Sequence, residues 1–517
     1  MTAIDGIQTG SRYTRQRPAK PALDVPAQDG VPVFETAPAV PTSPLLLFIG
    51  AAFLVSLAIP VNFNVGPFRM SPYRIILVLT FLPMIASLLA GKCGKITTTD
   101  ILLGGYALWS LLATIVHEGG GALSFGGIAT IETFGAYLVA RHAIRNVDDF
   151  LRFSKIMFYM LLVFVPFAAL ESYTSDPVYL KVFKVLGRTI ADAGNDPRLG
   201  LDRAQVAFEH PILYGVFAST TLSLLYYAPR KNAAGVSGFR KAWASVVATF
   251  FSLSSGAFIP VVVQTGLIAW NTVLQKFEWR WKLFVGLVVM AYLVIELGSN
   301  RNAFRVFADY LAFNSGNSYW RVLIFNYGIQ NVWDNPIFGF GLGNDWVRPH
   351  WMVISTVDNL WLVIAMRYGI PGFLLFAGAY LSVIIRLVRA KNLSEVENNQ
   401  RYALAFIAVS IVIAVSTVWL WNATYVYLMF ILGSGAWLSE VQPRSASTGS
   451  VDMQGDSAVV EAQEPRILRT RGKPHERKSS PSSTAPAGKS REVRRYSRVE
   501  PRRAQNKTDQ SDPDKGH

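Results

Sequence analysis

The chain alternates long apolar blocks with short polar connectors. We read about twelve apolar blocks of roughly 17 to 20 residues, the length of a helix that spans the hydrocarbon core of a bilayer. They occupy residues 44–62, 73–91, 101–117, 122–140, 154–171, 210–228, 242–257, 258–275, 282–298, 359–388, 402–420 and 423–439. Block 359–388 is longer than a single membrane-spanning helix requires. The pairs at 242–275 and 402–439 have almost no connector and must be tight hairpins or single bent regions. The pattern predicts an all-α polytopic integral membrane protein.

Composition agrees with this class. Of 517 residues, 51% are hydrophobic and 16% are charged, and the mean hydropathy is +0.29. These values are typical of membrane proteins rather than soluble globular ones. The single cysteine, Cys93, excludes an intramolecular disulfide and a CxxC metal site. The first forty residues contain no apolar signal-peptide core, so we expect the first block to serve as an uncleaved anchor.

The distribution of lysine and arginine predicts the orientation. With the N-terminus in the cytoplasm, basic connectors such as "GKCGKITTTD" and "RLVRAKNLSEVENNQR" fall inside, whereas "HEGG", "SSGAF" and "WNAT" fall outside. This follows the positive-inside rule. We therefore expect a multi-pass protein of the bacterial inner membrane. Both termini would be cytoplasmic, and two long loops, about 172–209 and 299–357, would be periplasmic.

The two ends of the chain differ from the apolar region at 44–439. Residues 1–43 are Pro-rich, and residues 440–517 are polar, Ser/Pro-rich and basic, so neither can bury enough apolar surface to fold alone. The tail is either simply solvated or attracted to anionic lipid; nucleic-acid binding is an alternative explanation of its charge. The net charge of +15 does not by itself indicate a nucleic-acid partner, and we expect none.

Polar chemistry is concentrated in the long loops. Within the apolar blocks the main charged residues are Glu132, Glu171 and Glu296, too few for a proton relay. The first loop ends in "NDPRLGLDRAQVAFEHPILYG", which carries Arg198, Arg203 and His210. These residues either face an anionic headgroup, or Arg203 pairs with a neighbouring acid on the surface. Pro211 fits the first turn of a helix.

The second loop contains an amphipathic pattern over about 318–333 that includes Arg321. It predicts a helix lying flat on the outer membrane face. Next come Gly339, Gly341 and Gly343, which permit close backbone approaches. They form no dinucleotide fingerprint, because no strand–turn–helix unit surrounds them. Four polar residues follow in one short stretch: Arg348, His350, Asp358 and Asn359.

Three segments resemble one family. "NPIFGFGLGN" followed by "DNLWLVIAMRYGIPGFLLF", "RLGLDRAQVAFEHPILYGVF" and "FFSLSSGAFIPVVVQ" are similar to motifs of the O-antigen ligase and polymerase superfamily, which are polytopic bacterial inner-membrane glycosyltransferases. The resemblance covers about 200–439. The chain departs from the family twice. Its mid-chain turn lacks the common arginine, and Asp358-Asn359 replaces the His-Asn on which ligases depend.

The resemblance implies transfer of a glycan from undecaprenyl diphosphate to an acceptor sugar hydroxyl, with neither a cofactor nor a metal. Arginines would bind the diphosphate, and His350 or Asp358 would accept the hydroxyl proton. Asp358 is alternatively only a helix cap. Trp346 and Trp351 would anchor at the headgroups or stack on sugar. The substrate-binding candidates are Arg198, Arg203, His210, Arg321, Gly339, Gly341, Gly343, Arg348 and Asn359.

We therefore predict an exopolysaccharide or O-antigen polymerase. Its partners would be an undecaprenyl-diphosphate-linked oligosaccharide and the lipid bilayer, with chain-length regulator and export proteins as further candidates. The alternatives are a ligase that moves a finished glycan to a lipid or protein acceptor, a transporter or flippase of lipid-linked sugars, and a non-enzymatic scaffold. A transporter would more typically place polar interruptions at mid-membrane depth.

Overall fold

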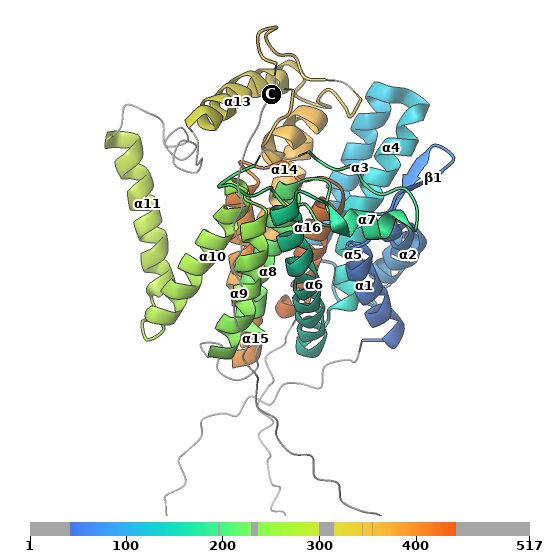
Figure 1. The fold of residues 1–517 in the computed structure, drawn as a ribbon. Coiled ribbons are helices and arrows are strands. Elements are labelled where there is room, and N and C mark those ends of the chain that lie inside the picture. Colours follow the sequence, from blue (N-terminus) through green and yellow to red (C-terminus); the bar gives the residue numbers. More distant parts are fainter. Residues whose placement is uncertain are drawn as a thin grey trace, which may run out of the picture. The chain divides into compact units, whose positions relative to one another are not determined.

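The computed structural model describes residues 42–194, 197–228, 236–298, 315–343, 345–353 and 355–440. These residues belong to one compact unit that ends at Ser447. A second unit, Thr448–His517, and the predicted N-terminal leader up to residue 41 lie outside the described residues. Figure 1 shows the described part as a bundle of helices.

Most of the helices follow the apolar blocks of the sequence. The helices are α1 (Pro44–Ser56), α2 (Pro72–Leu89), α3 (Thr98–Glu118), α4 (Ala122–Thr130), α5 (Ala136–Ala143), α6 (Val147–Thr174), α7 (Val178–Lys184), α8 (Pro211–Tyr227), α9 (Val236–Phe251), α10 (Ser255–Val273), α11 (Arg280–Gly298), α13 (Ser315–Asp334), α14 (Leu360–Arg389), α15 (Glu395–Ala414) and α16 (Asn422–Ser434). A π-helical segment, Ile131–Gly135, joins α4 to α5. The strands β1 (Phe63–Val65) and β2 (Phe68–Met70) form a short antiparallel hairpin that the sequence pattern did not predict.

The all-α membrane class is confirmed for the described residues. Six helices among them, namely α2, α3, α6, α10, α11 and α14, are long and apolar enough to cross a membrane. The remaining apolar blocks also lie on helices, but several of these are shorter. The count of twelve spans therefore stays a prediction.

The structure resolves the three ambiguous blocks. Residues 242–275 are a hairpin, because α9 ends at Phe251 and α10 begins at Ser255. Residues 402–439 form two helices joined by the segment 415–421. Block 359–388 is a single element, α14, that is interrupted by non-helical backbone at Gly369 (φ 71°, ψ −176°).

Helix α8 lies at the centre of the bundle. It packs against α6, α9, α10, α15 and α16, and nearly all of its residues are buried. A helix that is apolar on every side is suited to this position. Pro211 occupies its first turn as predicted, and His210 is the N-cap: its Nδ1 accepts a hydrogen bond from the Ile212 amide (3.2 Å).

Candidate functional site

The glycine-rich segment fits into the break in α14. At Gly369 the helical ladder stops, which leaves carbonyls of the preceding turn without helical partners. The amide of Phe340 donates to the Met366 carbonyl (2.9 Å) and the amide of Gly341 to the Arg367 carbonyl (3.1 Å). In return, the Ile370 amide donates to the Pro336 carbonyl (2.8 Å). The segment "GFGLG" therefore satisfies the backbone of the interrupted helix.

Glycine is required here for steric reasons. Gly339 and Gly341 have φ of 65° and 82°, in the left-handed region that side chains disfavour. A Cβ on Gly339 would collide with backbone atoms of Met366 and Arg367, and one on Gly369 with the Ile337 carbonyl. These positions face protein. Their role in substrate binding stays a prediction, and it would have to use the backbone.

Helix α3 holds the segment from its other side. The Glu118 carboxylate accepts the amides of Leu342 (3.1 Å) and Gly343 (2.6 Å). The Trp109 indole stacks on Phe338 with ring centroids 5.2 Å apart. The loop before α14 is thus fixed by a helix more than 200 residues earlier in the chain.

We expect Gly339→Ala to destabilise the protein by about 2–5 kcal/mol. The substitution combines an unfavourable φ with a clash against backbone that cannot move aside. The measurement is the thermal unfolding midpoint in detergent. Gly127→Ala on α4 is the matched control, because a Cβ there meets no atom within 4 Å. Equal midpoints for the two variants would contradict this role of Gly339.

Arg198 and Arg203 converge on the turn between α9 and α10. The Arg198 Nη1 donates to the Leu253 carbonyl (3.1 Å), and the Arg203 Nε donates to the Ser252 carbonyl (3.3 Å). Arg203 is buried, with 9% of its surface exposed. The Ala204 amide also donates to the Phe251 carbonyl (2.9 Å). The first long loop is thereby fixed to the turn, and two cations are concentrated there.

These two cations affect His210. Burial is the main cause that lowers the pKa of His210, and the positive charges of Arg203 and then Arg198 lower it further, to about 4. The ring is therefore neutral at physiological pH, which suits its role as acceptor at the start of α8. Its centroid lies 6.2 Å from that of Trp421.

Arg321 and Asp358 form a second polar group, between α13 and the start of α14. Burial lowers the pKa of Arg321, and its Nη1 is buried without a hydrogen-bond partner among the described residues. Asp358 is exposed. The surrounding protein raises the pKa of its carboxyl, whereas the charge of Arg321 lowers it. The pair thus combines a solvent-accessible carboxylate with a cation that has hydrogen-bonding capacity left.

The structure distinguishes the roles of Asp358 and Asn359, which the sequence could not do. Asn359 is the N-cap of α14, and its Oδ1 accepts the Leu362 amide (3.1 Å). The capping role considered for Asp358 therefore belongs to Asn359, which leaves the Asp358 carboxylate available for chemistry.

The remaining candidates lie in the loop before α14. Arg348 pairs with Asp345 (2.6 Å), and His350 is exposed. Trp346 is 5% exposed, and its indole donates to the Ser355 carbonyl (2.8 Å). Trp346 therefore anchors this loop in the α13–α14 core instead of presenting a face to sugar, whereas Trp351 is exposed.

The segment 415–421 connects the two polar groups. Its Val415 carbonyl accepts the Leu360 amide beside Asp358 (2.8 Å), and its Trp421 faces His210. Between them, Trp419 lies under the guanidinium of Arg367 (4.9 Å to the ring centroid). Arg367 was missed in the sequence. The available signal was an arginine inside an apolar block, which is rare and usually functional.

A polar network beside His210 was also missed. Arg74 donates from Nε to Glu132 (2.7 Å) and from Nη2 to Asn422 (3.2 Å). Asn422 in turn donates to Glu209 (2.8 Å). Glu132 lies in the π-helical segment, an irregularity that is frequent at functional sites. The network links α2, the π-helical segment, α16 and Glu209 just before α8. It lies at the end of the bundle where α8 and α14 begin, here called the loop-bearing end.

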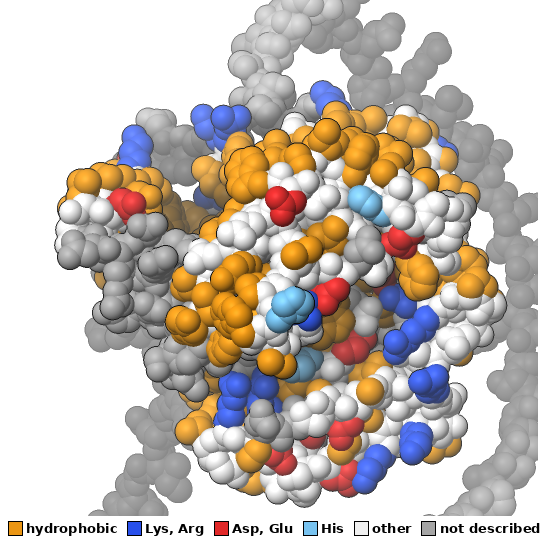
Figure 2. All heavy atoms as spheres, turned by 90° about the horizontal axis from the view of Figure 1, so that it is seen from above, with side chains coloured by type: hydrophobic (Ala, Val, Ile, Leu, Met, Phe, Trp, Pro, Cys, Tyr) orange, Lys and Arg blue, Asp and Glu red, His pale blue; other side chains and the backbone are white. Residues whose placement is uncertain are grey.

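Figure 2 shows the loop-bearing end from above. Basic, acidic and histidine side chains lie together near the middle of this face, among hydrophobic patches. In the part of the chain that the structure describes, no group of three or more His, Cys, Asp or Glu residues is arranged to hold a metal ion. The groups on this face are suited to binding an anion and to accepting a proton.

Residues 242–377 match the family model for O-antigen ligase. This segment match supports the resemblance to the O-antigen ligase/polymerase superfamily. No curated protein matches it. Members of the O-antigen ligase family are glycosyltransferase-like membrane enzymes, ligases and polymerases.

The O-antigen ligase match accounts for only one of the two polar groups. It runs from within α9 into α14 and so includes Arg321, Asp358 and the glycine-rich segment. Arg198, Arg203 and His210 precede it. Arg198 and Arg203 contact the O-antigen ligase segment through their hydrogen bonds to the carbonyls of Leu253 and Ser252.

Proposed function

We propose that this protein is a polysaccharide polymerase of the bacterial inner membrane. It transfers a glycan from undecaprenyl diphosphate to a hydroxyl of an acceptor sugar at the periplasmic face. The observation that carries the proposal is the Arg321–Asp358 pair, an accessible carboxylate beside a cation with an unused donor. Both residues lie in the O-antigen ligase segment.

The proposed reaction assigns one role to each group. Asp358 accepts the proton of the acceptor hydroxyl, whose oxygen forms a bond to the anomeric carbon of the donor glycan. The bond from that carbon to the diphosphate oxygen breaks, and undecaprenyl diphosphate leaves with the electron pair. Arg321 stabilises the charge that develops on the leaving diphosphate, which arginine can hydrogen-bond in a paired geometry.

The cations of the first long loop would bind the same carrier. Arg198 and Arg203 are held at the turn between α9 and α10, and the bridging segment 415–421 lies between them and Asp358. Arg367, above Trp419, adds a positive charge at this segment. A lipid-linked substrate must keep its tail in the bilayer. A site at the loop-bearing end of the bundle, beside the membrane surface, suits such a substrate.

The proposed orientation places the loop-bearing end in the periplasm and both chain termini in the cytoplasm. The support is the Lys/Arg asymmetry of the connectors. A site on that side has no access to cytoplasmic nucleotide sugars, which favours a lipid-linked donor.

Product size tests the polymerase assignment. Purified protein in lipid, supplied only with an undecaprenyl-diphosphate-linked repeat, should produce a ladder of longer chains on the same carrier. The ligase alternative is supported by the description of the matching family. A ligase would leave the repeat unextended and would transfer it only when a lipid or protein acceptor is added. The absence of a ladder together with such a transfer would overturn the polymerase assignment.

A further inference from the structure

A polar cavity lies at the end of the bundle opposite to the proposed active site. It has a volume of about 510 Å³ and is lined by the start of α3, the C-terminal turns of α14 and the residues just before Glu440. Arg386, Arg389 and Lys391 contribute three positive charges to its lining, and none of the described residues that line it is acidic. The other polar residues of its lining are Thr98, Ser382, Asn392 and Ser439.

Arg386 lacks partners for part of its guanidinium. Its Nε and Nη1 are buried and have no hydrogen-bond partner among the described residues. Arg386 as a whole is half-buried, and buried donors without a hydrogen-bond partner are unfavourable. An arginine placed in this way is therefore suited to binding an anion that the described residues do not supply.

Two carboxylates near this cavity are already engaged. Arg141 binds Glu440 (2.7 Å) and lies 3.6 Å from Asp100. Asp100 also accepts the Tyr137 hydroxyl (2.6 Å). Asp100 and Glu440 are thus already paired, and in the part of the chain that the structure describes no carboxylate lines the cavity.

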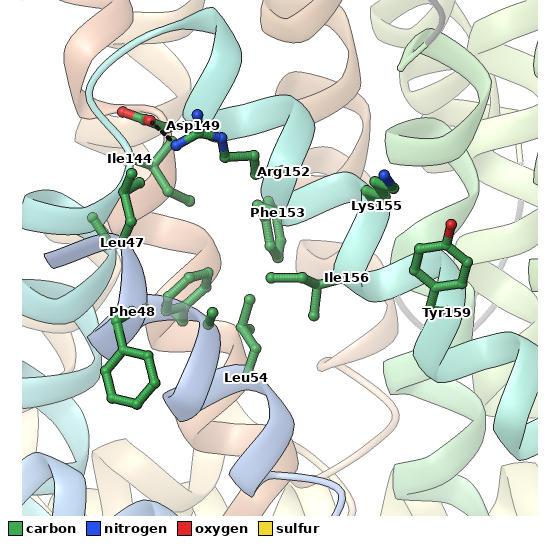
Figure 3. A pocket seen from close by; sticks show the side chains of 14 residues that line it. Leu47, Phe48, Leu54, Ile144, Asp149, Arg152, Phe153, Lys155, Ile156 and Tyr159 are labelled. Atoms are coloured by element: carbon green, nitrogen blue, oxygen red, sulfur yellow. Dashed lines mark ion pairs between the residues drawn. The ribbon is translucent and has the colours of Figure 1, made fainter. Parts of the chain in front are cut away.

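A second cavity at the same end shows the contrast. It has a volume of about 410 Å³ between α1 and α6 and is lined mainly by apolar side chains (Figure 3). Its Arg152 pairs with Asp149 (3.9 Å), and its Lys155 lies over the ring of Tyr159 (5.9 Å). That cavity is suited to binding a hydrocarbon chain, whereas the cavity at Arg386 is suited to binding an anion.

We propose that the cavity at Arg386, Arg389 and Lys391 binds a phosphate group. Phosphate oxygens match the paired donors of arginine better than a halide or a single carboxylate does, and the volume leaves room for the group to which the phosphate is attached. The basic connectors predict that this end faces the cytoplasm. The phosphate would come either from an anionic phospholipid of the inner leaflet or from a soluble phosphate compound. This site is independent of the proposed glycan transfer.

The test uses the full chain and separates the two sources. In one arm, protein in phosphatidylcholine nanodiscs is titrated with inorganic pyrophosphate. In the other, detergent-solubilised protein is titrated with phosphatidylglycerol, and native mass spectrometry counts the retained lipid. Saturable binding in either arm, weakened roughly tenfold or more in Arg386→Gln, supports the site, since a charge-assisted hydrogen bond is lost. The arm that responds identifies the source.

Lys276→Gln is the matched control. It removes one positive charge at the same end, from an exposed residue that does not line the cavity, and should change affinity by less than about twofold, because exposed charges are screened. Equal weakening in Arg386→Gln and Lys276→Gln, or no binding by the wild type in either arm, overturns the proposal. Lys391→Gln gives the same decision if Arg386→Gln does not fold.

Discussion

Asp358→Asn is expected to reduce glycan transfer by about 10²- to 10⁴-fold, the range for loss of a positioned general base. Asparagine keeps the size of the side chain but cannot accept the hydroxyl proton. Because Asn359, not Asp358, caps α14, the start of that helix should be preserved. The measurement is the initial rate of chain extension per unit of folded protein, with purified lipid-linked repeat as substrate.

Asp345→Asn is the matched control for this experiment. It makes the same chemical change in the same loop, where Asp345 forms a surface ion pair with Arg348. Surface ion pairs contribute little to the stability of the fold. Its rate should stay within about threefold of the wild type. His350→Ala is the competing variant. A large loss in His350→Ala together with near-normal turnover in Asp358→Asn would transfer the role of base to His350.

Arg321→Ala is expected to slow turnover by about 10- to 100-fold, corresponding to one charge-assisted hydrogen bond made mainly in the transition state. Arg321→Lys should fail nearly as severely, because a single ammonium cannot reproduce the paired geometry of guanidinium. Lys181→Ala, which removes a cation paired with Asp176 on the first long loop, is the control and should leave turnover unchanged.

The pH profile distinguishes a role of Arg321 at the site from simple damage to the fold. Asp358 can accept a proton only when ionised, so the rate is lost as the pH falls through its pKa. In the wild type, Arg321 lowers this pKa. Arg321→Gln removes that effect, and the acidic limb of the rate profile should move to higher pH. A reduced rate with an unmoved acidic limb would show that Arg321 does not act on Asp358.

The sequence by itself determined the helices and the location of the polar chemistry. Apolar blocks of bilayer-spanning length predict helices because every backbone polar group in hydrocarbon must be satisfied within the segment. Local rules also located the start of α8 at Pro211 and the helix near 318–333. The pair of Arg321 with Asp358 was not predicted, although both residues were singled out.

Only the tertiary structure decided what the polar residues do. Gly339, Gly341 and Gly369 form one unit because the amides of the loop satisfy the carbonyls freed in the break of α14. The sequence of the loop does not reveal the break in α14, and the sequence of α14 does not reveal that the loop fills this break.

The same reason explains the other surprises. A hydrogen bond joins Arg203 to Ser252, which is 49 positions away in the chain. Another joins Arg74 to Asn422 across 348 positions. Periodicity and capping report the neighbours of a residue along one helix. The partners of a side chain across the bundle depend on how the helices pack, and a single sequence carries no direct record of that packing.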